Sequence, residues 1–245
     1  VYGNIQLNHN LLTITDPKGQ EYLENKYNND DRVYEQRYGE GSYKVSYEEQ
    51  PGGILKTTII DRNNNTRIWY HNTLGNAIRK EVYTDGGIIT TNLEHNADGE
   101  RSRTIFPESN SIEYTFDSTN PNRLSQGNLL EVRRKSHLSE PDIVTTFSYE
   151  PLYNQVKTST DARNNTTTFY FDAQGNVNRI LYPTVTLPDG SPQIVESNFQ
   201  YNTYGQVVQA TDPEGIITAY EYYASGSPAG YLWKVIKDFN GTDPA

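Results

Sequence analysis

Cysteine and methionine are absent from this 245-residue sequence, and tryptophan occurs only twice. Without cysteine the chain can form neither a disulfide framework nor a thiolate metal site. No apolar run approaches the roughly 20 residues that a membrane-spanning helix needs. The 21 basic residues are outnumbered by 31 acidic ones, and the net charge of −10 argues against nucleic acid, whose phosphates need a clustered cationic surface. We therefore expect neither a nucleic-acid partner nor membrane insertion by this chain.

Hydrophobic residues are also scarce, at 34% of the chain, whereas tyrosine is abundant with 20 copies. Tyrosine suits half-buried pleated surfaces, and Asn, Gly and Asp recur roughly every ten residues, which disfavours helices. The sequence opens at Val1 without a signal peptide. We expect an all-β chain that is a segment of a longer protein, with its targeting signals elsewhere.

The strongest positive signal is internal repetition. Tyr153-Asn-Gln-Val…Thr-Asp161 returns 51 residues later as Tyr204-Gly-Gln-Val…Thr-Asp212. Residues 61–76 align without gaps on residues 161–176, at an offset of 100, and are identical at seven of sixteen positions. Each copy places alternating apolar segments on either side of a short turn, which is the pattern of a β-hairpin.

These repeats predict a long, curved or spiralling sheet of antiparallel hairpins. We expect one repeat region over residues 1–245, with the repeats weakest at about 84–144. A β-propeller is the alternative fold, although its blades need about 40–50 residues with four strands each. The turns of the type Asp16-Pro-Lys-Gly19 favour type I geometry. The residues expected to build such turns are Asp16, Gly19, Asp61, Gly75, Asp161, Asp172, Gly175, Gly205, Asp212 and Gly215.

The alternation of side chains also predicts where strands and insertions fall. Strands are expected within 1–12 and at 21–27, 33–38, 77–83, 88–93, 103–106, 111–116 and 231–237. Loop insertions are expected at 117–128, 136–142 and 182–193. A repeat scaffold tolerates such insertions because each unit contacts mainly its neighbours.

The repeated segments resemble the RHS/YD-repeat family, which includes the bacterial rearrangement-hotspot proteins, the C components of insecticidal toxin complexes and the teneurins. In that family a repeat rich in Tyr and Asp ends in Gly-Asn or Gly-Arg and an apolar residue, as Asp172-Ala-Gln-Gly175-Asn-Val177 does here. The resemblance implies a hollow β-shell that encloses a toxic segment in bacterial members and serves as an adhesion scaffold in animal members. The family's self-cleaving segment is not found, so autoproteolysis is not carried over.

The resemblance further implies a secreted or cell-surface protein. Its partners would be its own toxin or effector segment, or the neighbouring repeats of the full-length protein. We expect a structural scaffold without enzyme activity, cofactor or metal. The alternatives are an adhesion module that binds a carbohydrate or receptor, and a hydrolase hidden in residues 84–144.

No catalytic residue is expected. The four histidines are scattered without a nucleophile motif, and His71 occupies the strand position that Phe171 has in the sister repeat, which indicates packing. Asp recurs at the same turn position, and a recurring Asp is best explained by its side chain accepting backbone N–H bonds.

Two kinds of binding stay open at the sequence level. Asp61-x-Asn63-x-Asn65 copies the first half of an EF-hand loop, but Thr66 and Asn72 stand where that loop has Gly and Glu. The aromatic residues Trp69, Tyr70 and Tyr220 are candidates for stacking on sugar rings. Sequons for N-glycosylation occur at Asn64, Asn164, Asn165 and Asn240.

Overall fold

The computed structural model describes residues 10–226 and 229–238, and every helix or strand in that part of the chain is a β-strand. The strands are β1 Thr13–Thr15, β2 Glu21–Tyr27, β3 Val33–Tyr38, β4 Gly41–Gln50, β5 Ile54–Ile60, β6 Thr66–His71, β7 Ala77–Thr84, β8 Gly87–His95, β9 Arg101–Ile105, β10 Ser111–Phe116, β11 Leu129–Lys135, β12 Ile143–Tyr149, β13 Val156–Thr160, β14 Thr166–Phe171, β15 Val177–Leu181, β16 Val185–Thr186, β17 Pro192–Gln193, β18 Glu196–Tyr201, β19 Val207–Thr211, β20 Ile217–Tyr222 and β21 Leu232–Lys237. Nineteen of them belong to one sheet, while β16 and β17 form a hairpin of their own. The predicted fold class, an all-β chain of repeated antiparallel hairpins, is confirmed.

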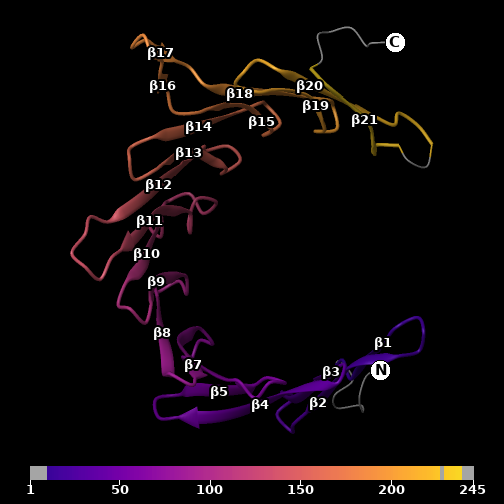
Figure 1. Cartoon of the computed structure of the whole chain (residues 1–245), viewed down its shortest axis with the longest axis vertical. Coiled ribbons are helices and arrows are strands. Elements are labelled where there is room, and N and C mark those ends of the chain that lie inside the picture. The colour runs from indigo at the N-terminus through magenta and orange to yellow at the C-terminus, as the bar shows by residue number, and fades with distance from the viewer. Residues whose placement is uncertain (1–9, 227–228, 239–245) are drawn as a thin grey trace. The chain divides into compact units, whose positions relative to one another are not determined.

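The chain divides into two compact units. Unit 1 comprises Val1–Glu113 and Arg134–Asp142, and unit 2 comprises Tyr114–Arg133 and Ile143–Ala245. In unit 1, consecutive strands from β1 to β9 pair antiparallel with one another (Figure 1). In unit 2, β12 to β15 pair in the same way, and β15 pairs with β18 because the β16–β17 hairpin lies between them in sequence. Each unit is therefore a meander of hairpins.

The expected strand positions hold closely, and 21–27, 33–38 and 111–116 coincide with β2, β3 and β10. The middle of the chain, where the sequence repeats are weakest, is also built of strands, and the residues between β10 and β11 form its longest loop. The expected insertion at 182–193 contains the β16–β17 hairpin. Most of the expected strand within 1–12, and the sequon at Asn240, lie outside the described residues.

Each sheet face has its own chemistry because successive strand residues point to opposite sides. On one side of unit 2, Phe169 is paired with Ile180 and Phe199 with Ala210. In unit 1 one side carries Val45 opposite Ile59, and in each unit we call such a side the apolar face. The other side, called the polar face, is richer in charged, hydroxyl and amide side chains, although the buried Ile68 and Ala219 also lie on it. Its unit 1 members include Glu48, Lys56, Tyr70, Arg79 and Asn92, and its unit 2 members include Ser148, Thr158, Thr168, Gln200 and Gln209.

The hydrophobic core is thin. Among the described residues only Ile68, Leu93 and Ala219 are buried hydrophobic side chains, and none of the described side chains is less than 2% exposed. Most strand residues are half-buried, as expected for a sheet one layer thick. No helix that is long and apolar enough to cross a membrane occurs in the described part of the chain.

Candidate functional site

Nine of the described turns share one pattern of hydrogen bonds over five residues. In the Asp161 turn, the Asp161 amide donates to the carbonyl of Asn165 at 2.9 Å, and the Asn164 amide donates to the carbonyl of Asp161 at 3.0 Å. The Asp161 Oδ1 also accepts the amides of Arg163 at 2.8 Å and Asn165 at 2.9 Å. The opening residues of the nine turns are Asp16, Asn28, Asp61, Asn72, Asn96, Asp161, Asp172, Asn202 and Asp212.

The fourth residue of each turn adopts a left-handed backbone. Gly175 has a φ of 87°, and Asn164 fills the same position with a φ of 64°. Glycine takes this conformation without steric cost, and Asn tolerates it better than other residues. The expected turn glycines Gly19, Gly75, Gly175, Gly205 and Gly215 all occupy this fourth position with positive φ. A type I turn followed by such a residue adds one residue to the hairpin, which explains the register shifts beside many of these turns.

All five expected turn aspartates open a turn of this kind. The turn expected at Asn28–Asp31 is confirmed, and Asn28 opens it. Asn202 was missed as an opener. The available signal was an Asn three residues before Gly205, since the side-chain oxygen of Asn accepts the same two backbone bonds.

The carboxylates of three turns are held in their ionised form. Hydrogen bonds from the side-chain amides of Asn65, Asn165 and Asn176, supported by backbone amides, lower the pKa values of Asp61, Asp161 and Asp172 respectively. In the EF-hand-like segment both oxygens of Asp61 are thus turned toward donors of their own turn. Within the described residues no group of three or more His, Asp and Glu side chains is placed to hold a metal ion. The arrangement stabilises the turn.

Tyrosines near the ends of strands tie neighbouring strands together. The Tyr201 hydroxyl donates to the carbonyl of Val177 at 2.7 Å, and the Tyr222 hydroxyl donates to that of Val207 at 2.8 Å. The remaining members of this set are Tyr27, Tyr47 and Tyr149. These bonds give the tyrosine-rich composition a structural role, since each satisfies a backbone carbonyl with a side chain that also packs on the sheet.

Histidines end two strands of unit 1. His71 is the last residue of β6 and His95 the last residue of β8, and the Nδ1 atom of each is buried without a hydrogen-bond partner in the described structure. Burial, and to a smaller extent the charge of Arg101, lowers the pKa of His95. Neither side chain is joined to a hydroxyl nucleophile by any hydrogen bond found among the described residues.

Of the three expected ligand-facing aromatics, Trp69 and Tyr70 do not form one platform. Trp69 and Tyr70 are consecutive in β6, so they point to opposite faces of unit 1. The Lys80 ammonium lies 5.3 Å from the ring centroid of Trp69, and the Arg79 guanidinium lies 3.7 Å from that of Tyr70. Cations thus occupy one side of both rings. Tyr220 belongs to unit 2.

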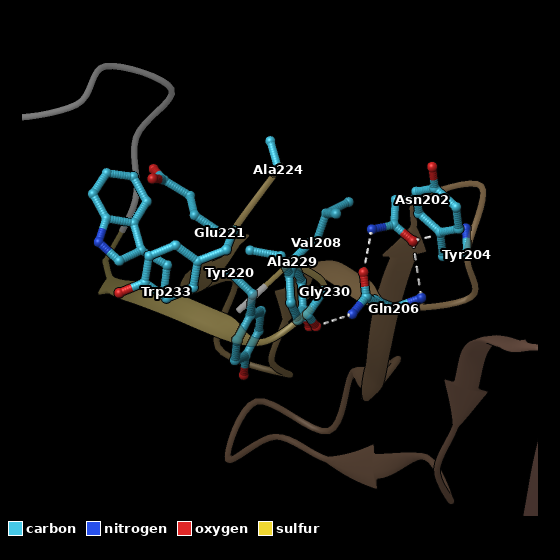
Figure 2. Close-up of a pocket in the computed structure, with 12 residues that line it drawn as sticks. Asn202, Tyr204, Gln206, Val208, Tyr220, Glu221, Ala224, Ala229, Gly230 and Trp233 are labelled. Atoms are coloured by element: carbon cyan, nitrogen blue, oxygen red, sulfur yellow. Dashed lines mark hydrogen bonds between the residues drawn. The ribbon is translucent and has the colours of Figure 1, made fainter. Parts of the chain in front are cut away.

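Tyr220 lines an open hollow of about 800 Å³ in unit 2, which we call the aromatic hollow (Figure 2). Its lining residues are Asn202, Tyr204, Gln206, Val208, Tyr220, Glu221, Tyr222, Tyr223, Ala224, Ala229, Gly230 and Trp233. Tyr204 is 87% exposed and Trp233 59% exposed, and the rings of Tyr223 and Trp233 lie 6.1 Å apart at 43°. The Gln206 side chain donates to the Gly230 carbonyl at 2.6 Å and accepts from Asn202 at 2.9 Å. These hydrogen bonds fix the turn from Asn202 to Gln206 beside the exposed aromatic rings.

Sequence reasoning did not single out Tyr204 or Trp233. The repeat pairs Tyr204 with Tyr153, whose ring lies against Gly175 and whose hydroxyl donates to the Ala173 carbonyl of the next turn. The Asp172 turn, which follows Tyr153, spans five residues. The loop that follows Tyr222 is longer, and a hydrogen bond from the Tyr223 amide to the Tyr231 carbonyl closes it. Equivalent tyrosines therefore have different surroundings, and only the three-dimensional structure distinguishes them.

Taken together, these features define a sheet of repeated β-hairpins with an exposed aromatic hollow in unit 2. No protein-family model and no curated protein matches the sequence. Among solved structures the chain is similar to "Crystal Structure of TcdB2-TccC3-TEV", at 12% identity and a TM-score of 0.45, and to "Crystal Structure of TcdB2-TccC3", at 11% identity and a TM-score of 0.44. Each match covers 94% of this chain and 16% of the other, so the chain spans a small part of those molecules.

Proposed function

We propose that this chain is a non-enzymatic structural scaffold, a segment of an RHS-type shell that encloses or presents a toxin or effector segment in a secreted or surface protein. The proposal rests first on the family resemblance of the repeats. The structural observation that carries it is the half-covered apolar face of a sheet one layer thick.

A single sheet cannot bury its apolar face by itself and needs another layer against it. Phe147, Phe169 and Phe199 recur along the apolar face of unit 2, yet all three remain half-buried. Neighbouring repeats pair with the strand edges and leave this face uncovered. A segment held against the apolar face would supply the missing layer, and we propose that the enclosed segment does so.

The repeated polar residues favour a scaffold over an enzyme. The aspartates that recur most clearly are engaged by amides of their own turns. His71 and His95 stand at strand ends. A catalytic site is a single constellation of nucleophile, base and stabilising donors, whereas these aspartates recur at equivalent turns and stabilise them.

Photo-cross-linking tests this proposal. A photoreactive phenylalanine analogue replaces Phe199 on the apolar face or its neighbour Gln200 on the polar face, in the protein expressed from its complete gene. We expect cross-links from position 199 to a segment outside residues 1–245, and few from position 200. Equal cross-linking from both positions, or none from position 199, would contradict an enclosed segment on the apolar face.

A further inference from the structure

We propose that Asp85, in the turn between β7 and β8 of unit 1, is a site of spontaneous covalent modification at which aspartate converts to isoaspartate. The conversion needs only water and the chain itself. It is independent of the scaffold role, because it depends on the hydrogen bonds of a single turn. Asp85-Gly86 is one of three Asp-Gly pairs in the sequence, together with Asp98-Gly99 and Asp189-Gly190.

An Asp-Gly pair is reactive because glycine has no side chain to shield its amide nitrogen. That nitrogen attacks the Cγ of the protonated aspartate carboxyl. A C–N bond forms, the amide proton and the carboxyl hydroxyl leave as water, and a five-membered succinimide ring results. Water then opens the ring at either carbonyl. Opening at the former backbone carbonyl gives isoaspartate, in which the main chain runs through the Cβ and Cγ of the residue.

The turn at Asp85 leaves both reacting groups unoccupied. Asp85 and Gly86 are exposed, and among the described residues no hydrogen bond engages the Gly86 amide or the Asp85 carboxylate. The side-chain bond across this turn joins its two flanks, from the Thr84 hydroxyl to the Gly87 carbonyl at 2.9 Å. The Asp85 side chain is therefore free to rotate over the Gly86 nitrogen.

Asp98-Gly99 has the same two residues in a closed turn. The Gly99 amide donates to the Asn96 carbonyl at 3.1 Å, and the Asp98 amide donates to the side-chain oxygen of Asn96 at 3.1 Å. The Gly99 amide must give up its bond before its nitrogen can attack, and that loss adds to the barrier. We therefore expect Asp98 to convert more slowly than Asp85.

Asp189-Gly190 is held at both reacting groups. The Gly190 amide donates to the Leu187 carbonyl at 2.9 Å. The Asp189 Oδ1 accepts the Ser191 hydroxyl at 2.6 Å and the Ser191 amide at 2.9 Å. These bonds from Ser191 lower the pKa of Asp189, so the protonated carboxyl that reacts is rarer. Asp189 should be the slowest of the three aspartates.

Isoaspartate would change the β7–β8 hairpin itself. It adds one carbon to the main chain of a loop of two residues, and the length of such a loop fixes the register of its strands. Thr84 and Gly87 face each other across this loop, so their contact would be the first to be disturbed. The modification would therefore loosen the tip of one hairpin.

Ageing of the folded 245-residue chain in water enriched in heavy oxygen tests the proposal. Ring opening adds a heavy oxygen atom at each converted site, peptide mapping locates it, and methylation by an isoaspartyl methyltransferase identifies isoaspartate. In a mildly acidic buffer we expect at least about fivefold more conversion at Asp85 than at Asp98 or Asp189, because each of those must first break a hydrogen bond. In concentrated urea, which removes the turns, all three should convert at similar rates.

Two variants serve as controls. Gly86→Ala places a methyl group beside the attacking nitrogen, and the fold accepts it, because Gly86 lacks a left-handed backbone and its Cβ would lie 3.8 Å from the Thr84 hydroxyl oxygen. Asp85→Glu keeps the charge but would have to form a larger ring. Both variants should lower conversion at position 85 at least to the level of Asp98, with an unchanged circular dichroism spectrum.

The proposal fails if the three pairs convert equally in the folded chain, or if Asp85 does not convert there although it does in urea. It also fails if the preference for Asp85 persists in urea, since the neighbouring sequence and not the fold would then decide the site.

Discussion

Residues 61–81 of unit 1 and residues 161–181 of unit 2 are the same hairpin built with different side chains. The opening Asp61 and Asp161 make the same hydrogen bonds, and Gly75 and Gly175 have φ angles of 82° and 87°. On the strand between them, Ile68 corresponds to Thr168 and His71 to Phe171. The two hairpins therefore share the hydrogen bonds and backbone conformation of their turns, whereas these strand positions accept different side chains of similar size.

The polar faces of the two units use different kinds of cross-strand contact. In unit 1, Lys56 pairs with Glu48 at 3.0 Å. In unit 2, hydroxyls bond to one another across the strands, with Ser148 and Thr158 at 2.5 Å and Thr160 and Thr166 at 2.8 Å. Both kinds of cross-strand pair hold neighbouring strands together. The sheet therefore requires polar cross-strand contacts of no particular chemistry.

The largest expected effect separates the two equivalent glycines. A Cβ at Gly75 would meet nothing within 4 Å, whereas a Cβ at Gly175 would lie 3.0 Å from the Tyr153 ring. Both alanine variants carry the strain of a left-handed backbone, about 1–2 kcal/mol. We expect Gly175→Ala to lower the free energy of unfolding by about 3 kcal/mol and Gly75→Ala by about 1 kcal/mol, measured by urea denaturation. Equal losses would show that Tyr153 moves aside freely.

The next effect concerns the opening aspartates. Asp161→Ala removes the acceptor of two turn amides and should lower the Tm by about 3 °C. Asp161→Asn should leave the Tm nearly unchanged, because Asn72 and Asn202 open other turns with an amide oxygen. The same pair of variants at Asp61 should behave alike, as its bonds are alike. A large loss in both Asn variants would mean that the charge, and not the acceptor oxygen, stabilises the turn.

Acid should weaken both units together. The folded chain lowers the pKa of Asp61, Asp161 and Asp172 from an ordinary value of 3.8, so their stabilisation is present above that value and is lost as the pH falls through the lower folded pKa. The pKa of His95 is also lowered, from 6.5, so a further loss begins as the pH falls below 6.5, where the unfolded chain binds a proton. Thermal unfolding from pH 7 to pH 3 measures both, and His95→Phe should remove only the upper step.

A smaller effect tests the strand-end position. His71→Phe replaces a side chain with an unpartnered buried nitrogen by the residue that unit 2 has at the same position. We expect a gain of about 0.5 kcal/mol in the free energy of unfolding, and a similar loss in the reverse variant Phe171→His. A loss in His71→Phe would show that the His71 ring makes a polar contact in solution.

The smallest effect compares Arg79 with Arg179, which are also 100 residues apart. The Arg79 guanidinium lies 3.7 Å from the Tyr70 ring centroid, and its Nε lies 3.2 Å from Glu81. Arg179 lies 5.1 Å from the Tyr170 ring centroid and donates to Glu196 at 2.8 Å. Each alanine variant should cost about 0.3 kcal/mol. Salt at about 1 M should abolish the Arg179→Ala effect, because that contact is ionic and half-exposed. It should remove only the part of the Arg79→Ala effect that comes from the Glu81 ion pair and leave the part that comes from the Tyr70 ring. Equal salt sensitivity would contradict this difference.

The fold could be predicted from the sequence because each hairpin of the repeat depends on residues that are close together in the chain. Asp161, Gly175 and their counterparts signal the turns, and the alternation between them signals the strands. The aromatic hollow was not predictable in the same way. Tyr153 and Tyr204 share a motif, yet their exposure depends on the length of the following turn and on which residues that turn brings near. Asn202 was missed as the opener of its turn, although the oxygen of an Asn side chain accepts the same backbone bonds as that of Asp.

The thin core has a thermal consequence. Heat capacity rises on unfolding mainly because apolar surface becomes hydrated, whereas newly exposed polar surface lowers it. Unfolding this chain would newly expose little apolar surface to water, because Ile68, Leu93 and Ala219 are the buried hydrophobic residues of the described structure. Its heat-capacity change per residue should therefore fall below the usual value of about 12–15 cal/mol/K. The stability of the sheet would vary little between cold and warm surroundings, because its backbone hydrogen bonds and turns do not depend on the temperature-sensitive hydration of a large core.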